Sequence, residues 1–100
     1  MIRGTTPDLE FKLPFNTDVI ESVWITFSQF NKELLTLDKA SCAFKDDVIT
    51  TRLTQEQTLL FTENAYVEIQ LRVLTKDGTA IASNIMRSPN QRILKGGIIQ

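Results

Sequence analysis

The sequence predicts an all-β domain, an antiparallel β-sandwich of seven or eight strands with one short helical turn near residues 54–61. Apolar and polar residues alternate along most of the chain, which is the pattern of a strand with one side in water. Turn-forming residues recur about every eight to twelve positions, as in sandwiches. At 100 residues the chain suits an immunoglobulin-like arrangement in a single domain, 1–100, and a small barrel is the alternative that this pattern leaves open.

The first three strands are expected where the alternation is clear, over residues 9–13, 23–30 and 35–37. Pro14 has no amide donor and should end the first of them. A two-residue turn at Asn31-Lys32 should join the second to the third, although the preferred Gly is missing.

Two short strands and the helical turn follow. The strands are expected over residues 42–44 and 49–53, with a turn at Asp46-Asp47 between them. The segment Thr54-Gln55-Glu56-Gln57 then has capping-box spacing, with Thr and Gln three residues apart. We therefore expect one or two helical turns, which packing must hold because so short a helix is unstable alone.

The last strands form a hairpin. Residues 66–73 alternate most clearly, and Asp77-Gly78 predicts the turn because both residues accept positive φ. The returning strand is expected over 81–85, interrupted by Pro89, and an extended or turn-like piece should resume over 91–95.

The inward-facing residues of these strands predict the core. Ten side chains are expected in it: Phe11, Leu13, Ile25, Phe27, Phe44, Leu53, Val67, Ile69, Leu71 and Ile81.

The composition excludes most catalytic chemistry. Without His, the chain has no Ser-His-Asp or Cys-His nucleophile and no imidazole for a metal. Cys42 is the only Cys, so no internal disulfide can form, and its place in the inward set predicts an inert thiol. The four Gly never reach the spacing of a phosphate-binding loop. We expect no catalytic residue, no cofactor and no metal, and we interpret Asp46-Asp47, with Asp38 nearby, as a solvated turn rather than a calcium site.

Two classes of partner are also unexpected. No apolar run approaches the ~20 residues that span a bilayer, and the N-terminus lacks the apolar core of a signal peptide. The net charge of −1 is not that of a typical nucleic-acid-binding protein.

Apolar residues outside the core pattern are the candidates for an interface. Trp24 and Tyr66 are out of phase with the apolar residues of their strands, and outward aromatics are typical of interface centres. The alternative is that a loop or the helical turn covers them, or that the second face of the sheet is also partly buried. Ile98 and Ile99 follow the flexible joint Gly96-Gly97 in an extended C-terminal tail, residues 96–100, where polar residues are usual.

Charge divides the chain into two parts. Residues 1–68 hold 6 Lys/Arg and 11 Asp/Glu, a net charge of −5, and residues 69–100 hold 5 Lys/Arg and 1 Asp/Glu, a net charge of +4. The simpler interpretation is solvated strand faces. The sharper hypothesis is head-to-tail attraction between identical subunits, with Arg72, Arg87 and Arg92 on the basic side.

Several stretches occur in an order that resembles a known family: Arg3-Gly4-Thr5-Thr6-Pro7, Leu9-x-Phe11-x-Leu13-Pro14-Phe15, Leu53-Thr54-Gln55-Glu56-Gln57-Thr58, Val67-Glu68-Ile69-Gln70-Leu71-Arg72-Val73, Asp77-Gly78 and Ala82-Ser83-Asn84. The chain resembles small structural proteins of bacteriophages (prophages) of Gram-positive hosts. From about residue 3 to 97 it is similar to the N-terminal immunoglobulin-like domain of siphophage upper baseplate proteins.

The resemblance implies a non-catalytic virion protein that binds other phage structural proteins, with no catalytic residues to transfer. It would be made in the cytoplasm of the bacterial host and work as a homo-oligomer in the tail, the baseplate, a connector or as a head decoration. Baseplate proteins continue into receptor-binding parts, so a direct role in host binding is not expected for this chain. The alternative function is a free-standing immunoglobulin-like module that binds carbohydrate or a host protein; an aromatic platform with adjacent amides would favour it.

Overall fold

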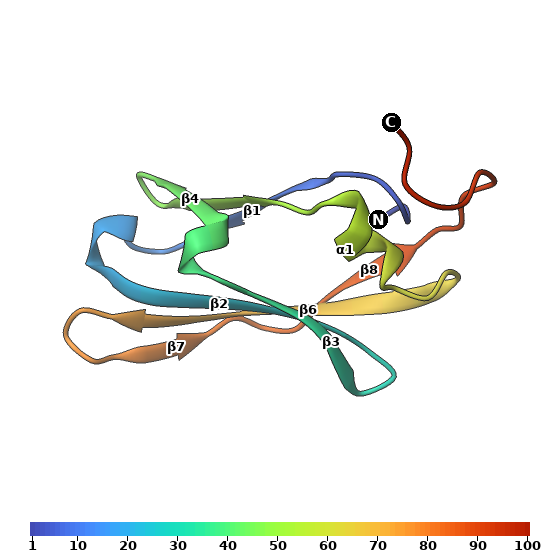
Figure 1. Cartoon of the computed structure of the whole chain (residues 1–100). Helices are drawn as coiled ribbons and strands as arrows, with labels where there is room; N and C mark the ends of the chain where they lie inside the picture. The colour runs from blue at the N-terminus through green and yellow to red at the C-terminus, as the bar shows by residue number, and fades with distance from the viewer.

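Two β-sheets pack face to face in the computed structural model, which describes all 100 residues (Figure 1). The elements in chain order are β1 (Asp8–Lys12), η1 (Thr17–Val19), β2 (Ile20–Gln29), β3 (Lys32–Asp38), η2 (Lys39–Ser41), β4 (Cys42–Lys45), β5 (Val48–Arg52), α1 (Gln55–Leu59), β6 (Ala65–Thr75), β7 (Ala80–Ala82) and β8 (Met86–Asn90), where η marks a 3-10 turn.

The smaller sheet has the strand order β1-β5-β4, and the larger has the order β3-β2-β6-β7, with β8 pairing the N-terminal part of β6. Every strand pair within the sheets is antiparallel. No ladder joins one sheet to the other, so the architecture is a sandwich rather than a barrel. The prediction of an all-β antiparallel sandwich, including its strand number and its helical turn, is confirmed.

The core lies between the two sheets, where period-two alternation directs one side of each strand inward. Its buried apolar side chains are Phe11, Ile20, Val23, Ile25, Phe27, Leu37, Ile49, Leu53, Phe61, Val67, Ile69, Leu71 and Val73. Seven of the ten predicted core residues belong to this set, and Leu13 and Phe44 pack against it while partly buried. The prediction for Ile81 is wrong: its side chain is 39 % exposed, because β7 is a three-residue edge strand that the smaller sheet does not cover.

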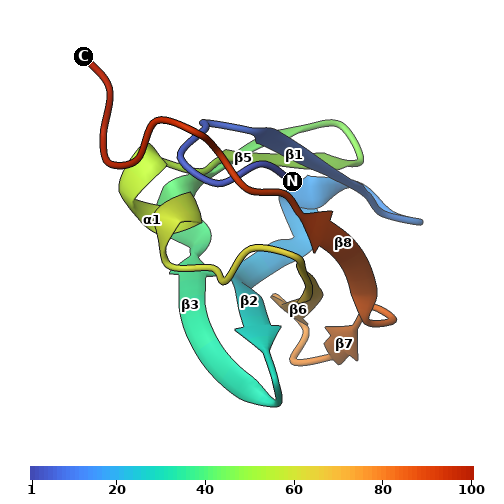
Figure 2. The same ribbon diagram turned by 90° about the vertical axis from the view of Figure 1, so that its right-hand side faces the viewer.

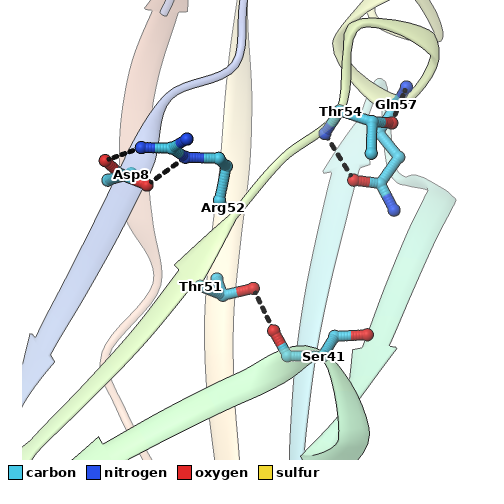
Figure 3. A network of polar contacts seen from close by, with 6 residues as sticks. All are labelled: Asp8, Ser41, Thr51, Arg52, Thr54 and Gln57. Atoms are coloured by element: carbon cyan, nitrogen blue, oxygen red, sulfur yellow. Dashed lines mark hydrogen bonds and ion pairs between the residues drawn. The ribbon is translucent and has the colours of Figure 1, made fainter.

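Helix α1 connects the smaller sheet to the larger at one end of the sandwich (Figure 2). Both bonds of the predicted capping box are present and are drawn in Figure 3: the Gln57 amide donates to Thr54 Oγ1 at 3.1 Å, and the Thr54 amide donates to Gln57 Oε1 at 2.9 Å. The buried Thr58 hydroxyl also donates to the Thr5 carbonyl at 2.9 Å. Phe61, which follows the helix, places its ring 5.8 Å from that of Phe27. Packing thus holds a helix that its length alone would not stabilise.

The smaller sheet is tied together by two further polar contacts (Figure 3). The Arg52 guanidinium donates to both carboxylate oxygens of Asp8, at 2.7 and 2.9 Å, across the β1–β5 pair. The Thr51 hydroxyl donates to the Ser41 carbonyl at 2.8 Å and connects β5 to the turn before β4. These contacts fix the register of the two edge strands against β5.

The hairpin between β2 and β3 turns one residue earlier than the sequence predicts. Phe30 and Asn31, with φ of 53° and 59°, form its loop, and Lys32 pairs with Gln29 as the first residue of β3. The cause is the buried side chain of Gln29, whose amide exchanges two hydrogen bonds with the backbone of Thr62, at 2.9 and 2.7 Å. Those bonds hold Gln29 within the sheet, so the turn must begin at the next residue.

The C-terminal strand predictions are wrong in two respects. Pro89 lies inside β8 rather than interrupting it, which is possible because β8 is an edge strand where a missing amide donor is tolerated. Residues 91–95, for which an extended or turn-like piece is predicted, form no strand; Gln91 makes an isolated parallel bridge to Ile2, and a bend follows at residues 94–95. The returning strand β7 also ends at Ala82 rather than at residue 85.

Candidate interaction surfaces

The outer face of the larger sheet is the side that faces away from the smaller sheet, the underside of the molecule in Figure 1. The strand registers place Trp24 at the middle of a row that crosses this face, between Asp38 on β3 and Arg72 on β6, with Ala82 of β7 beyond. The Trp24 side chain is 50 % exposed. No loop or helical turn therefore encloses it, and it is open to contact with another molecule.

Tyr66 lies on the same face but far from Trp24. It is 59 % exposed and pairs with Pro89, whereas Trp24 pairs with Arg72. Tyr66 and Arg72 are six positions apart on β6, which separates the two aromatic side chains by about 20 Å. The structure thus does not bring the two candidates together into one aromatic platform.

Charges of opposite sign lie toward opposite sides of the outer face, except for Glu68 of β6, which pairs with Arg87. Asp38 and Glu33 lie on β3 at one side; the Glu33 carboxylate accepts from the Thr36 hydroxyl, which also contacts Thr26 on β2. Arg72 and Arg87 lie on β6 and β8 at the other side, as their registers require. The single ion pair of the protein is Asp8–Arg52, so these outer-face charges have no ion-pair partner within the chain.

The C-terminal tail contacts helix α1 of its own chain. The Gln55 side-chain amide donates to the Ile99 carbonyl at 3.0 Å and accepts from the Ile99 amide at 2.8 Å, as in a strand pair. The side chains of Ile98 and Ile99 remain exposed. Arg92, the remaining basic candidate, is exposed between β8 and this tail and lies on no strand of the outer face.

Two further features were not predicted from the sequence. A hollow of about 380 Å³ separates β1 from the β7–β8 edge; core side chains such as Phe11 and Leu71 line it, together with exposed Ile81 and Met86. The Phe30 side chain is 75 % exposed at the β2–β3 turn, with a positive φ that bulky residues rarely adopt. The out-of-phase position of Phe30 gave a signal for its exposure, whereas the hollow depends on strand order, which periodicity does not contain.

The groups with potential chemistry are dispersed. No three His, Cys, Asp or Glu side chains come close enough together to hold a metal ion. Cys42 is partly buried, and this burial, followed by the nearby Asp38 charge, raises the pKa of its thiol. A raised pKa keeps the thiol protonated and weakly nucleophilic. None of the helices has the length and apolar character needed to cross a membrane.

Two carboxylates have lowered pKa values, both from local hydrogen bonds. Those from Arg52 lower the pKa of Asp8. At the β6–β7 turn, hydrogen bonds from Thr75 and then Thr79 lower the pKa of Asp77. Both groups are accounted for by the structure that they stabilise, a strand pair and a turn, so neither indicates a catalytic site.

Comparison with protein-family models, with curated proteins and with solved structures found no match for this chain.

Proposed function

We propose that the protein is a non-catalytic structural component of a bacteriophage virion, present in several copies and acting through contacts with other virion proteins and with itself. It would be made in the host cytoplasm and incorporated into the tail, the baseplate, a connector or the head surface. The resemblance of its sequence to phage structural proteins motivates the identity of the particle.

One observation carries the assembly role. The protein exposes as many large apolar side chains, thirteen, as it buries in its core. Besides the outer-face aromatics they include Leu74 beside the Trp24 row, Ile81 and Met86 at the hollow, and Ile98 and Ile99 in the tail. Scattered exposed apolar residues are ordinary, but grouped ones favour burial against a partner. An assembly in which several faces of each copy are covered accounts for all three groups.

The second candidate, a carbohydrate-binding module, receives less support. Stacking on a sugar needs an aromatic platform with neighbouring polar groups, and Trp24 and Tyr66 are too far apart to share one sugar ring, by about 20 Å along β6.

The test is the protein content of purified particles. Phages from an induced lysogen that carries this gene are purified on a density gradient and analysed by mass spectrometry. We expect peptides of this protein at several copies per particle, in constant ratio to the major tail protein across gradient fractions. Its absence from infectious particles, with the protein present in the lysate, would exclude the virion role.

A further inference from the structure

The outer-face charges have an arrangement that suits a second copy of the same face. Across the sheet, three rows of residues run in register: Asp38–Trp24–Arg72, Thr36–Thr26–Gln70 and Glu33–Ser28–Glu68–Arg87. The first and third rows begin with an acidic residue on β3 and end with an Arg, Arg72 on β6 and Arg87 on β8, with Glu68 next to Arg87 in the third row. When the first or the third row is placed against a reversed copy of itself, the acidic end of one lies opposite the basic end of the other.

We propose that two copies pair face to face through the outer faces of their larger sheets, about a two-fold axis parallel to the strands and between β2 and β6. Such an axis exchanges β2 with β6 and β3 with β7–β8 while keeping the position along the strands. Glu33 of each copy then lies opposite Arg87 of the other, twice in the pair. Trp24 lies opposite Arg72 of the other copy, also twice.

The central contacts fit this arrangement chemically. An Arg guanidinium stacked on a Trp ring gains a cation–π interaction, and neither Trp24 nor Arg72 makes one within its own chain. Thr26 lies opposite Gln70, so a hydroxyl faces an amide. The strand directions of two sheets packed face to face differ by up to about 30° because each sheet is twisted. The two sheets therefore come closest at their central strands, β2 and β6, and separate toward their edges. At those edges the side chains of Glu33 and Arg87 are long enough to reach each other.

The size of the face sets the strength of the contact. β2 and β6 have 10 and 11 residues, β3 has 7, and β7 and β8 have 3 and 5 along one edge; at a strand spacing of about 4.8 Å and a rise of about 3.3 Å per residue they cover roughly 600 Å² per copy. Stable interfaces bury about 800 Å² per partner, so a weak, concentration-dependent dimer is expected. The charges at its margins orient the encounter and reject other alignments.

The pairing does not depend on the virion role. Self-association is measured on the purified protein, so a monomeric protein could still belong to a particle, and a dimer could form in a protein that belongs to none.

The experiment compares charge reversals at the two predicted partners by sedimentation equilibrium from about 10 to 500 µM, a range chosen for a weak interface. The wild type should form a dimer and nothing larger. Glu33→Arg alone and Arg87→Glu alone should each weaken dimerisation about tenfold or more, because each places like charges opposite one another twice. An equimolar mixture of the two variants should dimerise again, because both contacts of the mixed pair join opposite charges.

The controls separate this contact from others. Glu10→Arg, a charge reversal on β1 of the smaller sheet, should dimerise as the wild type does, and Trp24→Ala should weaken dimerisation. Circular dichroism checks that each variant is folded. If Glu33→Arg or Arg87→Glu does not fold, the neutral variant at the same position, Glu33→Gln or Arg87→Gln, is measured in its place. A wild type that stays monomeric at 500 µM, a mixture that stays monomeric, or a ladder of larger species would overturn the proposal.

Discussion

Gln29 illustrates what a single polar side chain does to this fold. Residues 23–30 alternate clearly enough to predict a strand, yet the sequence does not reveal that a buried amide closes against Thr62, which lies 33 positions away. That long-range contact moves the β2–β3 turn by one residue. Local patterns therefore predicted the strand, and a tertiary hydrogen bond determined its end.

Gln29→Leu should lower the free energy of unfolding by about 1–3 kcal/mol, because it removes the acceptor of the Thr62 amide and one of the two side-chain donors to the Thr62 carbonyl, the other being Asn90 Nδ2. Urea denaturation measures the loss. The exposed Gln91→Leu should change the free energy by less than about 0.5 kcal/mol. Equal effects of the two substitutions would show that the Gln29 bonds add nothing to stability.

The apolar pattern gives a second prediction at this scale. Ile69→Ala should lower the free energy of unfolding by about 2–5 kcal/mol, since Ile69 lies in the buried cluster. The matched control is Ile85→Ala on an exposed side chain, with an expected change below about 0.5 kcal/mol. A loss below about half a kcal/mol for Ile69→Ala would show that the side of β6 that carries Ile69 does not face the core.

Asp77 predicts a pH dependence. Its folded-state pKa lies below the ordinary value of 3.8 because Thr75 and Thr79 donate to the carboxylate. It therefore stabilises the folded state above pH 3.8, and this contribution disappears as the pH falls through the lower folded-state pKa. Asp77→Asn should be less stable than the wild type at pH 7, and the difference should shrink below pH 4, as followed by thermal unfolding. A difference that stays constant from pH 7 to 2 would contradict the role of the charge.

At the scale of elements, the interior strands and α1 were predictable because their signals are local: alternation for β2, β5 and β6, and a capping box for the helix. The edges were not. Pro89 argues against a strand only where both strand sides are paired, and periodicity does not tell an edge from a centre. The outward Trp24 followed from alternation, but its position between Asp38 and Arg72 required the strand order.

The β2–β3 hairpin should tolerate a better turn residue. Phe30→Asn should raise the free energy of unfolding by about 0.5–1 kcal/mol, because Asn adopts the positive φ of this position more readily than Phe and the ring makes little contact with the core. Guanidinium denaturation measures the gain. A loss of stability would show that the exposed Phe30 ring contributes to the fold.

The tail should be dispensable for folding but not for assembly. Deletion of residues 96–100 removes two exposed hydrogen bonds to Gln55 and no core side chain, so the midpoint of urea unfolding should stay almost unchanged. The truncated protein should enter particles less efficiently, because Ile98 and Ile99 no longer supply contact area. Incorporation of the truncated protein at the wild-type level would show that the tail is not part of the assembly surface.

At the scale of the whole molecule, the surface charges and the exposed apolar side chains both favour association with other protein chains. On the outer face of the larger sheet, Asp38 and Glu33 lie at the β3 side and Arg72 and Arg87 at the β6–β8 side, around an exposed Trp24. Identical copies can therefore meet through oppositely charged margins, and apolar groups on other faces remain for different partners.

The most direct test of this account is incorporation of outer-face variants into particles. Trp24→Ala combined with Tyr66→Ala is compared with wild type and with the control Lys45→Glu, a charge reversal at an exposed position of β4 in the smaller sheet, each supplied to a lysogen that lacks the gene, and copies per particle are measured by mass spectrometry. We expect wild-type incorporation of the control and a loss of about tenfold or more for the double variant, provided that circular dichroism shows both to be folded. Incorporation of the folded double variant at the wild-type level would contradict the claim that the outer face is the assembly surface.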